Sequence, residues 1–268
     1  MAKTRIGFIG LGAMGKPMAK RLLDHGLEVA SCARVAREAI EELKQSGLIE
    51  AASPAEVADG ADQVITMVRD TGETEEAVLG ERGALGAMKP GSTLIVMSTI
   101  DPNFCRRMAD EAKAREISML DCPVSGFPFK AAEGTLALMV GGEAAAIERC
   151  RPSLEALGQI FPCGEVGMGM VTKLANNAVA LGTMGMLLEV RNFAQSFGLA
   201  EDDLMEVLKS ASANSFIAQN WDAIRGMWDN VIDLATKDAG ICLEVAEAAG
   251  IEMPLTTAAT RFPWPTES

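Results

Sequence analysis

The chain of 268 residues contains no tyrosine and only one histidine, His25. Without tyrosine, the protein cannot use the tyrosine–lysine proton relay of one class of dehydrogenases. A single histidine excludes a multi-histidine zinc site, and a histidine-based triad or 2-hydroxy-acid dehydrogenase would rest on that one residue. We therefore look to lysine, aspartate, glutamate, serine or cysteine for proton transfer.

Basic residues are also scarce, with 24 Lys and Arg against 37 Asp and Glu and a net charge of −13. This balance argues against nucleic-acid binding, which needs a basic face, and against adhesion to anionic membranes. An anionic ligand would need positive charge concentrated locally. Isolated lysines and arginines beside glycine turns are therefore the residues of interest.

Long apolar runs are lacking too. Four glycines interrupt the N-terminal apolar run before Lys16 closes it, and the stretch 174–190 contains Asn176, Asn177 and Thr183. We therefore expect neither a signal peptide nor a membrane helix. The six cysteines form no C-x-x-C pair, which indicates free thiols in a reducing, cytoplasmic environment and no metal site.

Short β-branched runs alternate with segments of helical period from Thr4 to Val140. The runs are R-I-G-F-I, L-E-V-A-S-C, Q-V-I-T-M-V, T-L-I-V-M-S, I-S-M-L-D-C and L-A-L-M-V. This alternation predicts an α/β fold that begins with a doubly wound parallel sheet of the Rossmann type, covered by helices on both faces.

After Gly164 the sequence predicts only helices, over 167–197, 201–209, 216–228 and 231–249. We therefore expect a sheet-containing domain over residues 1–164 and an all-α C-terminal domain over 165–268. The tail, residues 261–268, contains two prolines, which cannot continue a helix. We expect this tail to be loose.

The first predicted strand ends in Gly10-Leu11-Gly12-Ala13-Met14-Gly15, a G-x-G-x-x-G motif followed at once by a helix pattern. In that context Gly10 permits a tight turn, Gly12 lets the backbone approach a pyrophosphate, and Gly15 lets the helix pack closely on the strand. The helix N-terminus then faces the anion. With a second strand at 27–32, the motif predicts that residues 1–164 bind a dinucleotide.

The end of the second strand predicts which dinucleotide binds. An NAD site usually has Asp or Glu there to hold the ribose hydroxyls, and an NADP site has Arg. Here Arg34 and Arg37 follow the strand and no acid occurs before Glu38, which favours NADP and leaves NAD open. The alternative is that both arginines are solvated residues at the start of a helix.

Lys173 is the lysine whose neighbours best suit acid–base chemistry. On the predicted helix 167–197, Asn177 lies one turn further on the same face, and Leu174 and Ala178 are apolar. Apolar surroundings disfavour the charged ammonium, so Lys173 would exchange a proton near neutral pH, while the amide orients it. The alternative, which spacing alone favours, is a surface lysine whose stem covers apolar residues.

Five motifs, in order along the chain, resemble the β-hydroxyacid dehydrogenases, the family of 3-hydroxyisobutyrate dehydrogenase, tartronate semialdehyde reductase and the succinic and glyoxylic semialdehyde reductases. They are G-F-I-G-L-G-A-M-G-K-P-M-A, Ser98-Thr99-Ile100, Asp121-Cys122-Pro123-Val124-Ser125-Gly126 with Gly134-Thr135-Leu136 beyond it, Lys173 with Asn177, and Lys237-Asp238. The resemblance implies hydride transfer between a nicotinamide cofactor and a small 3- or 4-hydroxy acid or semialdehyde. It also implies a homodimer or homotetramer.

The resemblance implies roles for individual residues as well. Lys173 would be the general acid/base with Asn177 as its orienting partner, and Ser125 with Gly126 would bind the substrate carboxylate. The substrate-binding residues also include Phe127, Asn214 and Ser215. The residues implied at the cofactor are Gly10, Leu11, Gly12, Ala13, Met14, Gly15, Arg34, Arg37, Val68, Arg69, Thr99 and Lys237.

The sequence departs from the family pattern at three places, and the first of them, Phe127, leaves the substrate open. Phe127 stands where the family usually reads S-G-G, which removes a flexible glycine and adds apolar bulk. Val96 and Met97 stand where an acid commonly precedes the Ser-Thr pair, and the family normally runs about one helix further than Ser268.

Two other functions also remain open. An imine reductase is one, although those relatives usually carry another residue in place of Lys173. The other is a non-catalytic NADP-binding scaffold or sensor, which Phe127 and the early end of the chain favour and the pair of Lys173 and Asn177 opposes. Gly182 and Gly185 suit helix packing between subunits and within one subunit equally.

Overall fold

The computed structural model of the protein describes residues 4–32 and 37–265. The chain forms two compact units, residues 1–173 and 174–268. The boundary lies within the long helix α8 (Met168–Ser196).

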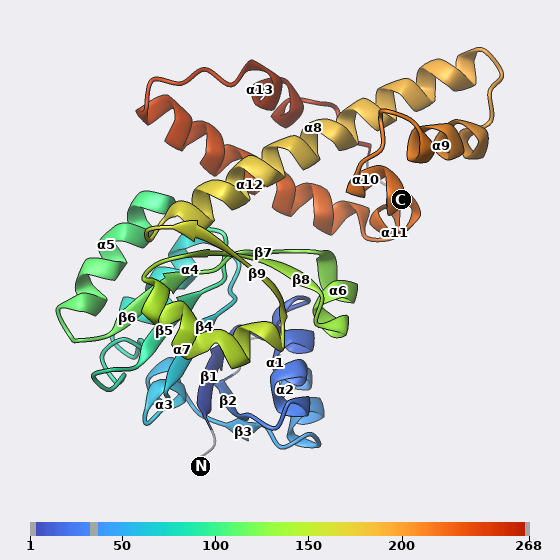
Figure 1. Cartoon of the computed structure of the whole chain (residues 1–268). Helices are drawn as coiled ribbons and strands as arrows, with labels where there is room; N and C mark the ends of the chain where they lie inside the picture. Colours follow the sequence, from blue (N-terminus) through green and yellow to red (C-terminus); the bar gives the residue numbers. More distant parts are fainter. Residues whose placement is uncertain (1–3, 33–36, 266–268) are drawn as a thin grey trace. The chain divides into compact units, whose positions relative to one another are not determined.

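The first unit is built on one sheet with the strand order β3-β2-β1-β4-β5-β6-β8-β7, in which β9 also pairs with β8 (Figure 1). The first six strands of this order, β3-β2-β1-β4-β5-β6, pair in parallel with their neighbours, which confirms the doubly wound sheet. The strands are β1 (Arg5–Ile9), β2 (Glu28–Cys32), β3 (Ile49–Glu50), β4 (Gln63–Thr66), β5 (Thr93–Val96), β6 (Ser118–Asp121), β7 (Val124–Ser125), β8 (Leu136–Gly141) and β9 (Gly158–Gly164).

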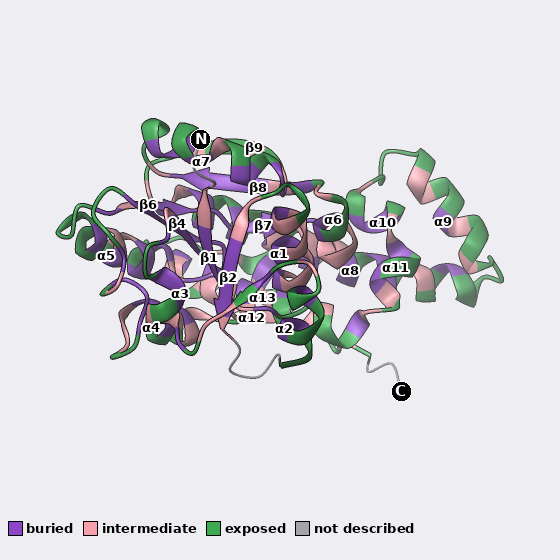
Figure 2. Cartoon of the chain, turned by 90° about the horizontal axis from the view of Figure 1, so that it is seen from below, coloured by how far each residue is buried: buried purple, intermediate pink, exposed green. Residues whose placement is uncertain are grey.

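Helices cover both faces of this sheet. Since successive residues of a strand point to opposite faces, neighbouring residues pack in different cores. Phe8 of β1 packs in one apolar core with Met18, and its neighbour Ile9 packs in a second core with Met108. Figure 2 shows the central strands β1, β2 and β4 mostly buried and the outer sides of the helices exposed. The helices are α1 (Gly15–Asp24), α2 (Arg37–Lys44), α3 (Pro54–Ala58), α4 (Thr71–Leu79), α5 (Pro102–Lys113), α6 (Phe127–Glu133) and α7 (Ala144–Glu155).

The far edge of the sheet is mixed, which the sequence does not predict. Strand β8 pairs antiparallel with β6 and β7 and parallel with β9. Strand β7 has only two residues, and β9 contains Pro162 and has no buried residue. Neither segment therefore carries the continuous apolar run by which a buried parallel strand is recognised.

The second unit is helical, as predicted. After α8 come α9 (Glu201–Ser210), α10 (Phe216–Gln219), α11 (Trp221–Arg225), α12 (Trp228–Ala248) and α13 (Pro254–Thr260). Residues 216–228, predicted as one helix, are interrupted at Asn220. The Asn220 side-chain amide donates to the carbonyl of Phe216 at 2.9 Å, so a side chain takes over a carbonyl at the end of α10.

The tail is packed rather than loose as far as it is described. The indole of Trp264 lies 6.0 Å from that of Trp228 and 4.7 Å from the ring of Phe262, and the Trp228 indole N–H donates to the carbonyl of Pro265 at 2.8 Å. Aromatic packing thus holds a segment in which proline prevents a helix. Among the described helices, none combines the length and apolar character needed to cross a bilayer.

Candidate active site

The three glycines of the turn between β1 and α1 are required for three different reasons. Gly10 has a φ of +103°, and a side chain there would collide with the carbonyl of Met67. A side chain on Gly15 would collide with the carbonyl of Gly10, so this glycine allows α1 to pack against the turn. A side chain on Gly12 would meet no atom within 4 Å. The backbone at Gly12 is therefore open to a ligand, which fits a pyrophosphate.

The N-terminus of α1 is open as well. No described side chain accepts a hydrogen bond from its first turn, whereas Ser53 caps α3, Asp70 caps α4 and Asp101 caps α5. Uncapped backbone N–H groups at a helix start attract anions. The turn borders a cavity of about 490 Å³, lined by Leu11, Gly12, Ala13, Lys16, Arg37, Glu38, Ala39 and Glu42.

Positive and negative side chains are mixed around this cavity. Lys16 is ion-paired with Glu42, and Arg37 is ion-paired with Glu41 at 3.1 Å and with Glu50. Hydrogen bonds from Lys44, and to a lesser extent from Arg37, hold the pKa of Glu50 below its usual value. Arg37, predicted from sequence to bind the cofactor, lines this cavity and is engaged with carboxylates. Arg34 lies outside the described residues.

The loops after β4 and β5 lie at the same sheet edge as the glycine turn, because all three follow parallel strands. Val68 and Arg69 belong to the first loop and Thr99 to the second. The backbone N–H of Val68 donates to the Ser98 hydroxyl at 2.9 Å, and that of Arg69 donates to Glu73 at 3.1 Å. Ser98, which we did not assign a role from sequence, thus fixes one loop to the other.

Lys173 lies in the second turn of α8 with only 9% of its surface exposed. The start of this helix is held by Asp121 of β6, whose carboxylate accepts hydrogen bonds from the backbone N–H groups of Gly167 and Met170 at 2.8 Å each. Most of the Lys173 side chain is therefore covered by neighbouring residues, which a stem lying over apolar residues would also give.

In the second unit, one carboxylate connects two predicted site residues. Asp238 of α12 accepts a hydrogen bond from the Asn177 amide at 2.6 Å and forms an ion pair with Lys237 at 2.8 Å. The carbonyl oxygen of Asn177 accepts a hydrogen bond from Asn176 at 3.0 Å. Asp238 is almost fully buried. Its place beside Lys237 was the sequence signal, but its contact with Asn177 was not predicted.

The segment after β7 changes conformation sharply. Ser125 ends the strand, Gly126 has a φ of +144°, and Phe127 has a φ of +63° at the start of α6. The rings of Phe127 and Phe129 stack with centroids 5.9 Å apart. A glycine is therefore favoured at two successive positions, and the second of them is occupied by phenylalanine.

Asn214 and Ser215 have local structural contacts. The Ser215 hydroxyl accepts a hydrogen bond from the backbone N–H of Ala218 at 3.0 Å and so caps α10. The side-chain oxygen of Asn214 accepts one from Gln219 at 2.8 Å. Both contacts order the chain between α9 and α10.

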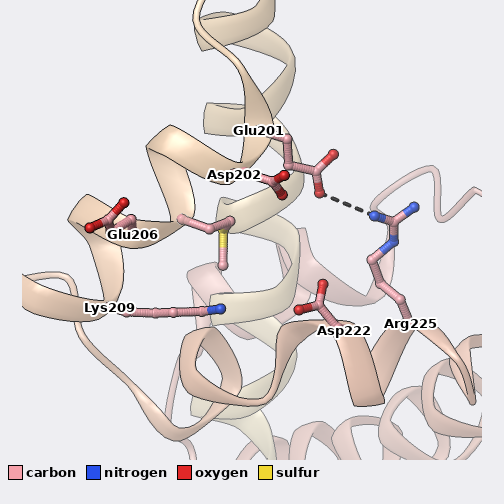
Figure 3. Close-up of a pocket in the computed structure, with 7 residues that line it drawn as sticks. Glu201, Asp202, Glu206, Lys209, Asp222 and Arg225 are labelled. Carbon is pink, nitrogen blue, oxygen red and sulfur yellow. Dashed lines mark hydrogen bonds and ion pairs between the residues drawn. The ribbon is translucent and has the colours of Figure 1, made fainter.

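A second cavity, of about 370 Å³, lies in the helical unit and includes none of the predicted site residues. Its lining carries Glu201, Asp202, Glu206 and Asp222 together with Lys209 and Arg225 (Figure 3). Glu201 accepts hydrogen bonds from the Trp221 indole at 3.2 Å and from Arg225 at 3.1 Å. These contacts join α9 to α11, so the charged lining serves helix packing.

Comparison with known proteins assigns the chain to a family. Residues 5–169 match the family described as the NAD binding domain of 6-phosphogluconate dehydrogenase, and residues 167–263 match that described as NAD-binding of NADP-dependent 3-hydroxyisobutyrate dehydrogenase. The chain belongs to the β-hydroxyacid dehydrogenase family. It is a dehydrogenase that acts on CH–OH groups with a nicotinamide cofactor.

Individual relatives agree with this membership. An uncharacterised oxidoreductase of Bacillus subtilis, YkwC, is 38% identical over 94% of this chain and 89% of its own. The NAD-dependent L-serine dehydrogenase of Pseudomonas aeruginosa is 34% identical over 94% and 88%. The 3-hydroxyisobutyrate dehydrogenase of Mycobacterium tuberculosis, solved with L-serine, has a TM-score of 0.85 at 29% identity and covers 97% of this chain and 92% of its own.

Proposed function

We propose that this family member interconverts a small 3- or 4-hydroxy acid and its semialdehyde, prefers NADP, and uses Lys173 as general acid/base. The observation that supports the proposal most strongly is the burial of Lys173 on a helix that also carries Asn177, whose amide Asp238 holds. A buried amine exchanges a proton more readily near neutral pH than an exposed one.

In the oxidation direction, Lys173 Nζ accepts the proton of the substrate hydroxyl as the C–H bond breaks. In reduction, the same group in its ammonium form donates a proton to the developing alkoxide, whose negative charge it stabilises.

Asn177 orients the amine or the hydroxyl, and Ser125 with the backbone of Gly126 binds the carboxylate. Phe127 limits the room beside it, and Asn214 and Ser215 lie at the edge of the substrate. Nicotinamide, when bound, supplies the hydride acceptor or donor.

The NADP preference rests on Arg34 and Arg37. Guanidinium groups bind a phosphate through two hydrogen bonds, and Arg37 borders the cavity beside the glycine turn. A 2′-phosphate would replace Glu41 and Glu50 as the partner of Arg37. These ion pairs are solvent-exposed, with 65% of the Arg37 side chain exposed, so exchanging them for a phosphate costs little.

A spectrophotometric assay of nicotinamide oxidation and reduction tests this function. The panel comprises 3-hydroxyisobutyrate, L-serine, 4-hydroxybutyrate, succinic semialdehyde and a cyclic imine, each with NADP(H) and with NAD(H). We expect turnover with at least one hydroxy acid or semialdehyde and none with the imine. Turnover of the imine alone would identify an imine reductase. Tight NADPH binding without any turnover would identify a scaffold.

We propose further that the protein is a homodimer or homotetramer that associates through α8. Val179, Met186, Phe193 and Phe197 form an outward apolar stripe with 72, 58, 65 and 77% of their surfaces exposed. Gly182 lies on open surface near this stripe, whereas Gly185 packs against Trp264 within the unit. Light scattering should therefore give a mass of two or four chains, and Met186→Glu should reduce it, whereas a monomeric wild type contradicts the proposal.

We also propose that the protein is cytoplasmic. All six cysteines are free, and Cys105, Cys122 and Cys150 are buried. Burial raises the pKa of the Cys122 thiol well above its usual value, so this thiol resists oxidation. Free, unreactive thiols are typical of proteins in reducing compartments.

A further inference from the structure

Asp121 lies at the carboxyl end of β6 and is fully buried. Its Oδ1 accepts a hydrogen bond from the N–H of Gly167 and its Oδ2 accepts one from the N–H of Met170, each at 2.8 Å. These donors lie at the start of α8, 46 and 49 residues further along the chain. One carboxylate thus joins the sheet to the first turn of the helix that carries Lys173.

Two glycines enclose this carboxylate. Gly141, the antiparallel partner of Asp121 in β8, would collide with Oδ1 if it carried a side chain. A side chain on Gly169 would lie 2.8 Å from Oδ2 and would also collide with the carbonyl of Met139. The space therefore fits aspartate and the start of α8 and nothing larger. Burial raises the pKa of Asp121, and the N–H groups of Gly167 and Met170 oppose that rise.

We propose that Asp121 is a positioning residue for the reaction, because its hydrogen bonds fix the axial position and the rotation of the turn from which Lys173 projects. The proposal rests on the acid–base role of Lys173 proposed above. Lys173 follows Met170 by three residues, which places it about 4.5 Å further along the axis and near the same face. Without the carboxylate, the N–H groups of the first turn lose their partners and the turn frays.

The other capping side chains of this unit act locally. Ser53 accepts a hydrogen bond from Glu56, three residues later, and Asp101 accepts one from Asn103, two residues later. Each stabilises the start of its own helix. Ser53→Ala is therefore a matched control, since it removes a cap from α3, which carries no proposed site residue.

The test compares Asp121→Asn, Asp121→Ala and Gly169→Ala with Ser53→Ala in the full chain. Amide hydrogen exchange of residues 167–173 measures whether the start of α8 is still held by residue 121. The rate at which acetic anhydride acetylates Lys173, measured by mass spectrometry, reports how well that lysine is held. Turnover of 3-hydroxyisobutyrate with NADP+ reports the reaction. If Asp121→Ala fails to fold, Asp121→Asn, which keeps one acceptor oxygen, and Gly169→Ala still provide the comparison.

We expect Asp121→Asn to speed exchange of the 167–173 amides and acetylation of Lys173 by about tenfold or more, which Ser53→Ala does not do. We expect kcat to fall about 10–100-fold while the KM for NADP+ stays within about twofold, because the reacting amine is displaced and the nucleotide site is not. A residue with a purely structural role would lower Tm and leave kcat per folded molecule unchanged.

Two results overturn the proposal. One is unchanged exchange and acetylation in folded Asp121→Asn, whatever its turnover. The other is faster exchange with wild-type kcat, since the cap would then support the fold alone. A wild type that turns over no panel substrate, but whose Lys173 acetylation depends on Asp121 as expected, contradicts the proposed function instead and leaves Asp121 as the residue that holds Lys173 in place.

Discussion

Phe127 combines a bulky side chain with a backbone conformation that favours glycine. Its φ is +63°, and apart from Glu116 no other described non-glycine residue has a positive φ. A left-handed conformation costs an L-residue about 1–2 kcal/mol. Its ring stacks on Phe129, and such a contact returns about 0.5–1.5 kcal/mol. The aromatic pair therefore offsets much of the backbone strain next to Ser125 and Gly126.

Replacing Phe127 by glycine and by alanine separates the strain from the ring contact, because both variants lose the ring. We expect Phe127→Gly to be more stable than Phe127→Ala by about 1 kcal/mol in urea unfolding, since alanine keeps the left-handed strain. The same pair of substitutions at Lys130, within α6, should give the opposite order, because alanine is the better helix former. Equal or reversed stabilities at Phe127 would show that its backbone is not strained.

Arg34 and Arg37 give the cofactor prediction at the residue scale. NADPH should bind more tightly than NADH by about one to two decades, the worth of a charge-assisted hydrogen bond to phosphate. Arg34→Ala should remove most of this difference and Arg37→Ala part of it, since Arg37 already has carboxylate partners. Glu50→Gln serves as a control with the opposite expected effect: it removes one carboxylate partner of Arg37 and should tighten NADPH binding. Equal dissociation constants for the two cofactors in the wild type would refute the preference.

Elements with a strong repeating pattern are the ones that the sequence predicts well. Helix α8 was predicted over 167–197 and spans Met168–Ser196, because its apolar residues recur at helical spacing without proline. The buried strands β1, β2, β4, β5, β6 and β8 coincide with continuous apolar runs. The break at Asn220 was missed because a local side-chain hydrogen bond, to the carbonyl four residues earlier, leaves no mark on the apolar periodicity. The strand β7 was missed because its two residues are recognised only by their pairing with β8.

The packed tail is an element that sequence propensity could not reveal. Trp264→Ala should lower the free energy of unfolding by about 1–3 kcal/mol, because it removes a partly buried aromatic ring from contact with Trp228 and Phe262. Thermal unfolding measures the change, with the exposed neighbour Pro263→Ala as control. A loose tail would give the same melting temperature for Trp264→Ala and the wild type.

At the scale of the whole molecule, the motifs located the candidate site but not the partners that hold it. The glycine turn was predicted with a distinct reason for each glycine, and the structure gives Gly12 the open surroundings that a phosphate requires. From the sequence, Asp121 and Asp238 were known only as members of motifs, without a predicted contact. Their contacts with α8 join segments 46 to 61 residues apart, and single-sequence periodicity carries no information on such pairs.

The central claim is that Lys173 exchanges the proton at the substrate oxygen. The decisive measurement is kcat for Lys173→Arg beside Lys173→Ala and the wild type, with the panel substrate of highest kcat/KM. Both variants should lose about 10²–10⁴-fold in kcat with NADPH affinity unchanged. Alanine has no ionisable group, and the guanidinium of arginine stays protonated and cannot exchange the proton. Near-normal turnover in Lys173→Arg, accompanied by a lower melting temperature only in Lys173→Ala, would show a structural lysine and move the catalytic role to another group, with Lys237 as the next candidate.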